Sequence, residues 1–503
     1  MNKVSLISIL CLLMCSMTLS AQTYEDALRD NFWNDSRNVT GVRQSKLSGS
    51  YAELFAGYDA GGFRDTWQAA QSWNAGAVTA SIQHLDKMSL KGSFSFTQTE
   101  GYGMCGSMFI KPGYYPVDIL EFTPGRKTLQ TYAFDGGLAY DLGSRWRIGA
   151  MMDFESANMA KRKDLRHSNW HLDMTVAPGF MYHKGRNFAI GANYLFRKTS
   201  ETVEAEQIGI SESSYYAFLD KGLMYGVHSI WTGSGLHLDE AGVKAFPVNE
   251  FSNGAALQMQ YKGLFAEVEY LRTSVSIGEK EYMWFRFPGN EVNVRAGYKH
   301  FVWDKAVHYM RLHFNWRDRE LSESVLEKVS VGGVATVIDH GSNVISREGS
   351  WTLMPEYEYV SKKVEVLVSA KVEGQDKVVS QMYPHVAAQS LIMYGADARA
   401  KVHLGMFILA AEAGYSAGSV TEDAWLVSDA SGVQTSPYRL QDWYDMHMEY
   451  VTAQRLSAGL ALRCTFEEGI YIEASGTWTH GFNLKYLTAP NHYGAALKLG
   501  YNF

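Results

Sequence analysis

Charged residues alternate with apolar ones in many segments of this sequence, and they are the first groups that could act on a solute. Eight of them, in the segments 264–275, 290–301, 305–317 and 390–401, are Glu267, Glu269, Arg295, Lys299, Arg311, His313, Asp397 and Arg399. Acidic and basic groups that line a water-filled passage create a transverse field that discriminates between solutes. We interpret these eight as candidate pore-lining residues. The alternative, a salt-bridged wall that only stiffens the structure, stays open.

Other patterns that could support chemistry are not apparent in the sequence. The 15 histidines are scattered without the spacing of metal ligands. Ser, His and Asp are plentiful, but no spacing marks an activated nucleophile. The formal charge of −7 gives no electrostatic reason to expect nucleic acid. We therefore expect neither an enzyme nor a cofactor or metal site, and no nucleic-acid partner.

The segment 99–128 is too apolar for a freely solvated loop. It contains Met108, Phe109, Tyr114, Tyr115 and Phe122, and its three prolines prevent a long helix. Apolar side chains in such number should bury themselves somewhere. We expect this loop to fold into the mouth of the passage and constrict it. Packing on neighbouring loops or against a partner protein are the alternatives.

These residues must be positioned by strands, because the apolar and polar residues alternate with a period of two. The sequence predicts eighteen strands, with an uncertainty of two, near 49–58, 73–84, 88–98, 129–141, 145–156, 169–182, 187–198, 251–261, 264–275, 290–301, 305–317, 350–360, 363–373, 390–401, 404–415, 455–466, 469–479 and 492–503. Two more strand-like segments, 220–231 and 440–451, are expected in external loops as hairpin extensions.

Three features favour a membrane barrel over a soluble sandwich. The predicted strands run to roughly 10–13 residues, against about 5 or 6 in soluble sheets. Aromatic residues gather near strand ends, and short connections alternate with long ones, as in outer-membrane barrels. The expected fold is thus all-β: a transmembrane antiparallel up-and-down barrel of about 18 strands (16–20), with short periplasmic turns and long extracellular loops.

The N-terminus has the order of a secretory signal peptide: a positive charge at Lys3, an apolar run, then small residues ending at Ala21. We expect residues 1–21 to be the signal peptide, 22–48 a short periplasmic segment, and 49–503 the barrel. The segment 22–48 is too short for the full plug of an energised receptor. Of the exported cysteines, Cys105 is placed in a loop and Cys464 on the lipid-facing side, so a bond between them is not favoured.

The last predicted strand ends on an aromatic residue. Tyr501 and Phe503 lie on its apolar face, which is similar to the terminal strand that the bacterial barrel-assembly machinery recognises. The sequences FWNDSRN at 32–38, PGYYPVD at 112–118 and EFTPG at 121–125 resemble an uncharacterised family of outer-membrane barrels from Bacteroidota. This resemblance covers essentially the whole mature chain. It implies location and architecture, and it supplies no catalytic residue and no substrate.

Together these patterns predict a channel for small solutes in the outer membrane of a Gram-negative bacterium, with the loop 99–128 constricting its lumen. The expected partners are outer-membrane lipid and the barrel-assembly machinery, and a partner protein in the same membrane is left open. Two other functions remain: a surface scaffold or docking subunit of an outer-membrane complex, and a narrow channel for hydrophobic compounds with 22–48 as a hatch. Lumen polarity favours the channel for polar solutes over the hydrophobic one.

Overall fold

The computed structural model describes residues 24–163, 165–206, 215–224, 226–231, 245–279, 282–302, 306–332, 334–382, 385–425, 440–466 and 469–503. The expected signal peptide, residues 1–21, lies outside these ranges. The strands are Gly49–Gly61 (β1), Gln71–His84 (β2), Met88–Ser107 (β3), Asp118–Asp141 (β4), Trp146–Lys161 (β5), Arg166–His183 (β6), Phe188–Glu206 (β7), Tyr215–Asp220 (β8), Gly226–Trp231 (β9), Ala245–Tyr261 (β10), Leu264–Glu279 (β11), Tyr282–Val302 (β12), Ala306–Val331 (β13), Val334–Ser361 (β14), Val364–Met382 (β15), His385–Leu404 (β16), Phe407–Trp425 (β17), Arg455–Thr465 (β18), Ile470–Gly481 (β19) and Asn491–Asn502 (β20).

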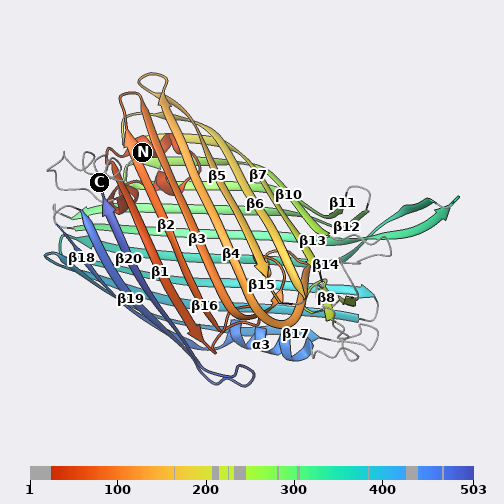
Figure 1. Cartoon of the computed structure of the whole chain (residues 1–503). Helices are drawn as coiled ribbons and strands as arrows, with labels where there is room; N and C mark the ends of the chain where they lie inside the picture. Colours follow the sequence, from red (N-terminus) through yellow and green to blue (C-terminus); the bar gives the residue numbers. More distant parts are fainter. Residues whose placement is uncertain are drawn as a thin grey trace, which may run out of the picture.

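Eighteen of these strands close into one antiparallel barrel, which confirms the predicted fold (Figure 1). Each strand pairs with the next along the chain, except that β7 pairs with β10 across the β8–β9 hairpin. The ring closes where β1 pairs with both β2 and β20. Closure matters because an open edge would leave backbone N–H and C=O groups unpaired in a hydrocarbon layer.

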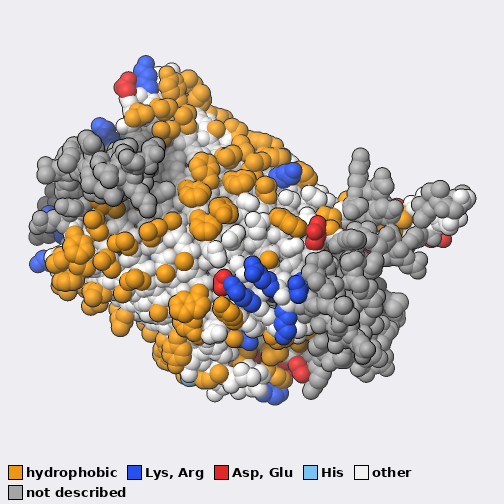
Figure 2. All heavy atoms as spheres, viewed as in Figure 1, with side chains coloured by type: hydrophobic (Ala, Val, Ile, Leu, Met, Phe, Trp, Pro, Cys, Tyr) orange, Lys and Arg blue, Asp and Glu red, His pale blue; other side chains and the backbone are white. Residues whose placement is uncertain are grey.

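The outer wall of the barrel is apolar. Large side chains such as Leu257, Leu460 and Tyr493 point outward and are more than half exposed, and Figure 2 shows hydrophobic side chains spread over this surface. The residues between them on the same strands face the lumen, as alternation requires. A surface of this kind is stable in lipid, whereas in water it would be an aggregation hazard.

The two ends of the barrel differ. Both termini and the short connections, such as 142–145 and 405–406, lie at one end, which we name the turn end (Figure 1). The opposite end, the loop end, carries the longer connections and the helix Leu440–Thr452 (α3). Several strands extend far beyond the predicted lengths at the loop end, and β14 reaches 28 residues.

The predicted loop 99–128 is shorter than expected. Residues up to Ser107 continue β3, and β4 begins at Asp118, so only 108–117 connect the two strands. The first residues of β4 also pair with β8, from Asp118 opposite Asp220 to Glu121 opposite Ala217. Backbone pairing above the apolar belt therefore converts most of the expected loop into sheet.

The segment 440–451 is helical, so its prediction as a strand-like extension was wrong. Leu440, Tyr444 and Met448 are buried on one face of α3 at a spacing of four residues, which is the period of a helix rather than of a strand. The second expected extension, 220–231, does belong to a hairpin at the loop end, formed by β8 and β9. Among the described residues, no helix is long and apolar enough to cross a membrane.

The N-terminal segment forms three short helical turns, Tyr24–Arg29 (α2), Phe32–Asp35 (η1) and Val39–Gln44 (η2). They lie inside the barrel near the turn end, as the red coils of Figure 1 show. Side chains of Asn31 and Asn38 accept hydrogen bonds from the backbone N–H groups of Trp33 and Thr40 and so begin the two 3-10 turns. This segment of 24–48 thus occupies the lumen.

Candidate functional site

The N-terminal segment is bound to the lumen wall by polar contacts. Arg37 pairs with Asp153 and Glu269 at 3.3 Å each, and Arg29 pairs with Glu358 at 2.9 Å and Glu365 at 3.0 Å. These contacts reach β5, β11, β14 and β15. Because the four carboxylates come from widely spaced strands, the segment bridges the lumen instead of lying along one strand.

Apolar packing supports the same segment. Trp33 is 1% exposed, lies edge-on to Phe265 at 5.3 Å between ring centroids, and donates from Nε1 to Gln260 at 2.7 Å. A Cβ at Gly41 would overlap the Trp33 ring, so glycine is required where η2 crosses it. Ala27 and Val42 join a second apolar cluster with Ile82 of β2. The segment is therefore a small, well-packed plug.

Five of the predicted pore-lining residues contact this plug. Glu267 is hydrogen-bonded to Ser36, Glu269 pairs with Arg37, Arg295 donates to the Asp35 carbonyl, and Lys299 pairs with Asp30. The Arg311 guanidinium lies over the Phe32 ring and is bound to Glu356 and Glu358. His313 is half-buried on β13 opposite Arg295. On this wall the charges serve to hold the plug.

The remaining two, Asp397 and Arg399 on β16, face the open part of the lumen. Both are exposed, as is Glu412, which stands opposite Arg399 on β17. Their outward neighbours include the exposed Tyr394 and Leu409. An inward charge stays exposed only where there is solvent beside it, so the lumen next to β16 and β17 is accessible to water.

Two glycines on the lumen wall leave room for the carboxylates of Asp397 and Glu412. A Cβ at Gly414 would lie against the Asp397 carboxylate and the Ser457 hydroxyl, and a Cβ at Gly459 would overlap Glu412. The inner face of the neighbouring strands is also built from small side chains, among them Ser475 and Ala496, which pair directly. The wall formed by β17–β20 therefore leaves free space beside the plug.

A cavity lies at the turn end of this wall. It has a volume of about 320 Å³ and is lined by Tyr24, Glu25, Asp26 and Leu28 of the plug and by residues of β1 and β15–β20. Its charges are largely paired: Arg463 donates to Glu473 at 2.7 Å, and Lys401 lies 3.2 Å from Glu25. Arg399, the predicted pore-lining residue, also lines it.

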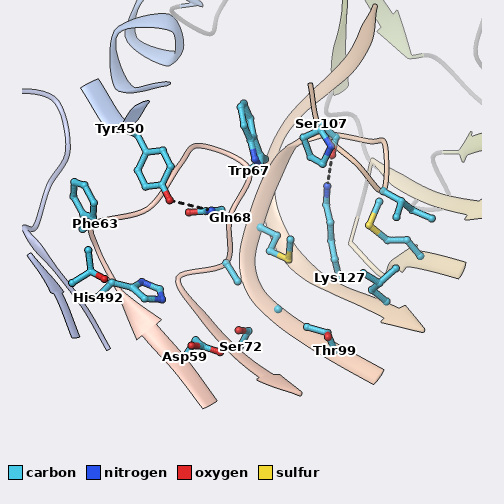
Figure 3. Close-up of a pocket in the computed structure, with 18 of the residues that line it drawn as sticks. Asp59, Phe63, Trp67, Gln68, Ser72, Thr99, Ser107, Lys127, Tyr450 and His492 are labelled. Carbon is cyan, nitrogen blue, oxygen red and sulfur yellow. Dashed lines mark hydrogen bonds between the residues drawn. The ribbon is translucent and has the colours of Figure 1, made fainter. Parts of the chain in front are cut away.

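A larger cavity of about 580 Å³ lies at the loop end (Figure 3). Asp59, Ser72, Ser457, Thr479 and His492 line it from the barrel wall. Apolar and aromatic side chains line it from the inward-folded connections and α3: Phe63, Trp67, Phe109, Ile110, Pro112 and Tyr450. The strands β1 and β17–β20 contribute to both cavities, so the two cavities open on the same side of the lumen.

The short connection 108–117 folds inward beside the larger cavity. Met108, Phe109 and Tyr115 are buried in an apolar cluster with Phe246, Phe285 and Phe287 of β10 and β12, and Tyr114 packs against it. Phe122 belongs instead to a separate cluster with α3, where its ring lies 5.3 Å from that of Trp443. The five predicted constriction residues therefore divide between two sites of packing.

Buried carboxylates hold the connection in place. Glu201 accepts from the backbone N–H of Ile110 at 2.8 Å, and Glu250 accepts from the Tyr114 hydroxyl at 3.0 Å. Asp118, beyond the apolar belt, accepts from the Ser107 hydroxyl at 2.8 Å. Burial, aided by nearby Asp220, raises the pKa of Asp118 to about 8.

The sequence patterns did not single out Asp59, Trp67 and Tyr450, because these residues come from a strand end, from a short connection and from a segment expected to be a hairpin extension. The pair of aromatic residues Phe63 and Trp67 was the available signal.

Tyr501 and Phe503 form a stacked pair at the end of β20, with 5.4 Å between their ring centroids, and Phe503 is exposed to the outside. Cys105, buried in β3 and not in a loop, and Cys464 on β18 are both free thiols.

Solved structures with similar folds are outer-membrane proteins and transporters. They include the copper transporter OprC (TM-score 0.43, 9% identity, 91% of this chain and 80% of that chain) and the ferric-catecholate import receptor Fiu from E. coli K12 (0.41, 8%, 91% and 82%). Another is OccAB2 from Acinetobacter baumannii (0.35, 8%, 91% and 98%). No curated protein sequence matches this chain. Residues 41–503 match the family of unknown function DUF6850, and the chain belongs to that family.

Proposed function

We propose that this protein is an outer-membrane channel that lets small polar solutes pass beside a resident N-terminal plug. The observation that carries the proposal is the pair of cavities, one at each end, that open on the same side of the lumen. Between them the wall carries the exposed charges Asp397 and Glu412 and otherwise mostly small side chains, with Arg399 at the edge of the turn-end cavity. A solute following this wall would meet water and hydrogen-bonding groups throughout.

The orientation follows from the two ends. The turn end, with both termini and the plug, would face the periplasm, and the loop end would face outside, as is usual for outer-membrane barrels. The connection 108–117 narrows the outer mouth by its inward packing. The resemblance of the motifs at 32–38, 112–118 and 121–125 supports a source among Bacteroidota.

A scaffold function is the main competitor, because a plugged barrel needs no conducting path. It predicts that side chains on the free wall can be enlarged without consequence for transport. A channel for hydrophobic compounds is less well supported, because the path carries exposed charges at mid-depth.

Conductance in a planar bilayer tests the proposal with a matched pair of variants. Ala496 faces the lumen and Ala495 faces outward on the same strand, β20. Ala496→Trp should place an indole in the path and lower the single-channel conductance sharply, whereas Ala495→Trp should leave it unchanged. Heat-modifiable migration on a gel reports folding of both variants. No conductance from the folded wild type, or equal conductance from all three proteins, would reject this path.

A further inference from the structure

The cavity at the loop end has the size and lining of a small-molecule site. Its volume of about 580 Å³ lies within the range of ligand pockets. Its wall side presents hydroxyl groups and Asp59, and its other side presents aromatic and aliphatic surface (Figure 3). We infer that this cavity binds amphipathic solutes that carry hydrogen-bond donors on one side and an apolar ring or chain on the other. The inference rests on the proposed channel, of which the cavity would be the outer binding site.

The apolar side of the cavity is fixed before any ligand arrives. Trp67 lies against the His447 ring of α3 at 4.8 Å, and His447 is bound to Asp65 at 2.9 Å. The Gln68 side chain donates to the Tyr450 hydroxyl at 3.4 Å. These contacts tie the connection 62–70 to α3, so the aromatic surface is preorganised and a ligand need not order it.

The charges of the cavity favour a donor over an anion. The Lys127 ammonium is 3% exposed, donates to the Ser107 carbonyl at 2.8 Å and lies 3.4 Å from Glu121, a carboxylate that it shares with Lys161. It is therefore bound within the protein and almost inaccessible to a ligand. The Arg455 guanidinium is covered by the rings of Phe63 and Tyr450 and donates to the Val451 carbonyl at the end of α3. Both cations are therefore held by protein contacts, although the buried Arg455 Nε has no acceptor among the described residues.

Asp59 is different. Its carboxylate lies against the backbone of Gly494 and lines the cavity. Ser72, its cross-strand partner on β2, lies beside it on the same wall. With the described part of the chain it makes no hydrogen bond or ion pair. A half-buried carboxylate that faces a cavity can accept strong hydrogen bonds from an ammonium or hydroxyl group of a ligand. The imidazole of His492 lines the same wall and has a buried Nδ1 that lacks a partner among the described residues.

The experiment compares three probes that share a phenyl ring: 2-phenylethylamine, 2-phenylethanol and phenylacetate. Binding is measured by ligand-observed NMR on the folded, detergent-solubilised full chain, so that it does not depend on conduction. We expect affinity to decrease from the amine to the alcohol to the carboxylate. Asp59→Asn should weaken binding of the amine about tenfold or more, because it removes a charge-assisted hydrogen bond. Binding of the alcohol should be much less affected.

Trp67→Ala should lower the affinity for all three probes by a similar factor, since it removes apolar surface and no charge. Asp135→Asn is a lumen-facing control outside this cavity, and it should change none of the affinities. Tightest binding of phenylacetate, or equal affinities of the amine for wild type and Asp59→Asn, would overturn the inference. Binding by a protein that does not conduct would reject the proposed channel and leave this site intact.

Discussion

Replacing Trp33 by alanine should release the N-terminal plug while the barrel stays folded. The side chain is 1% exposed, packs on Phe265 and donates to Gln260. Truncating a buried tryptophan costs about 3–5 kcal/mol. The cost falls on docking of residues 24–44, because the sheet of the barrel is hydrogen-bonded within itself. Since each ~1.4 kcal/mol is a factor of ten, the undocked population should rise about 100-fold to 4,000-fold.

Thiol labelling measures this population. A cysteine is introduced at Ala27, which is 1% exposed in the second apolar cluster. The background is Cys105→Ser, Cys464→Ser, which removes both cysteines that lie outside the expected signal peptide. A hydrophilic maleimide should label the introduced cysteine slowly in the parent and faster by the factor above in Trp33→Ala. Trp73→Ala is the matched control, because Trp73 is 58% exposed on the outer wall. An unchanged labelling rate in Trp33→Ala, with heat-modifiability retained, would show that Trp33 does not hold the plug.

Two further predictions concern the strand ends. Deleting Phe503, or changing it to Asp, should lower outer-membrane abundance more than Asn502→Ala does, because the exposed ring ends the closing strand beside Tyr501. Equal levels of all three variants in membrane fractions would show that Phe503 is not an assembly signal. The raised pKa of Asp118, about 8, means that the packed state of the loop end favours the protonated acid. Its stabilisation is fully present below the ordinary pKa of 3.8 and is lost progressively as the pH rises to about 8. Protease cleavage within 108–117 should therefore increase between these two pH values in the wild type and level off above pH 8. An identical pH profile in Asp118→Asn would refute this cause.

The barrel and its two faces follow from the local alternation of apolar and polar residues. A period of two over many long segments is a local property, and it required one apolar and one polar side on each strand. That is why Asp397 and Arg399 could be placed in the lumen, and why the aromatic end of β20 could be recognised from Tyr501 and Phe503 alone. The inward burial of Met108, Phe109 and Tyr115 followed from composition, because apolar side chains in such number require cover.

Which of the inward charges meet water depends on the packing of segments that are distant in the chain. Glu267, Glu269 and Arg295 alternate as regularly as Asp397 does, yet they bind the plug because residues more than 200 positions earlier in the chain cross the lumen there. Likewise, the residues 440–451 form a helix because one face packs on Leu120 and Phe122, a contact between distant segments. Period and composition specify each strand's faces, but the contents of a lumen depend on contacts between segments far apart in the chain, which no local pattern records.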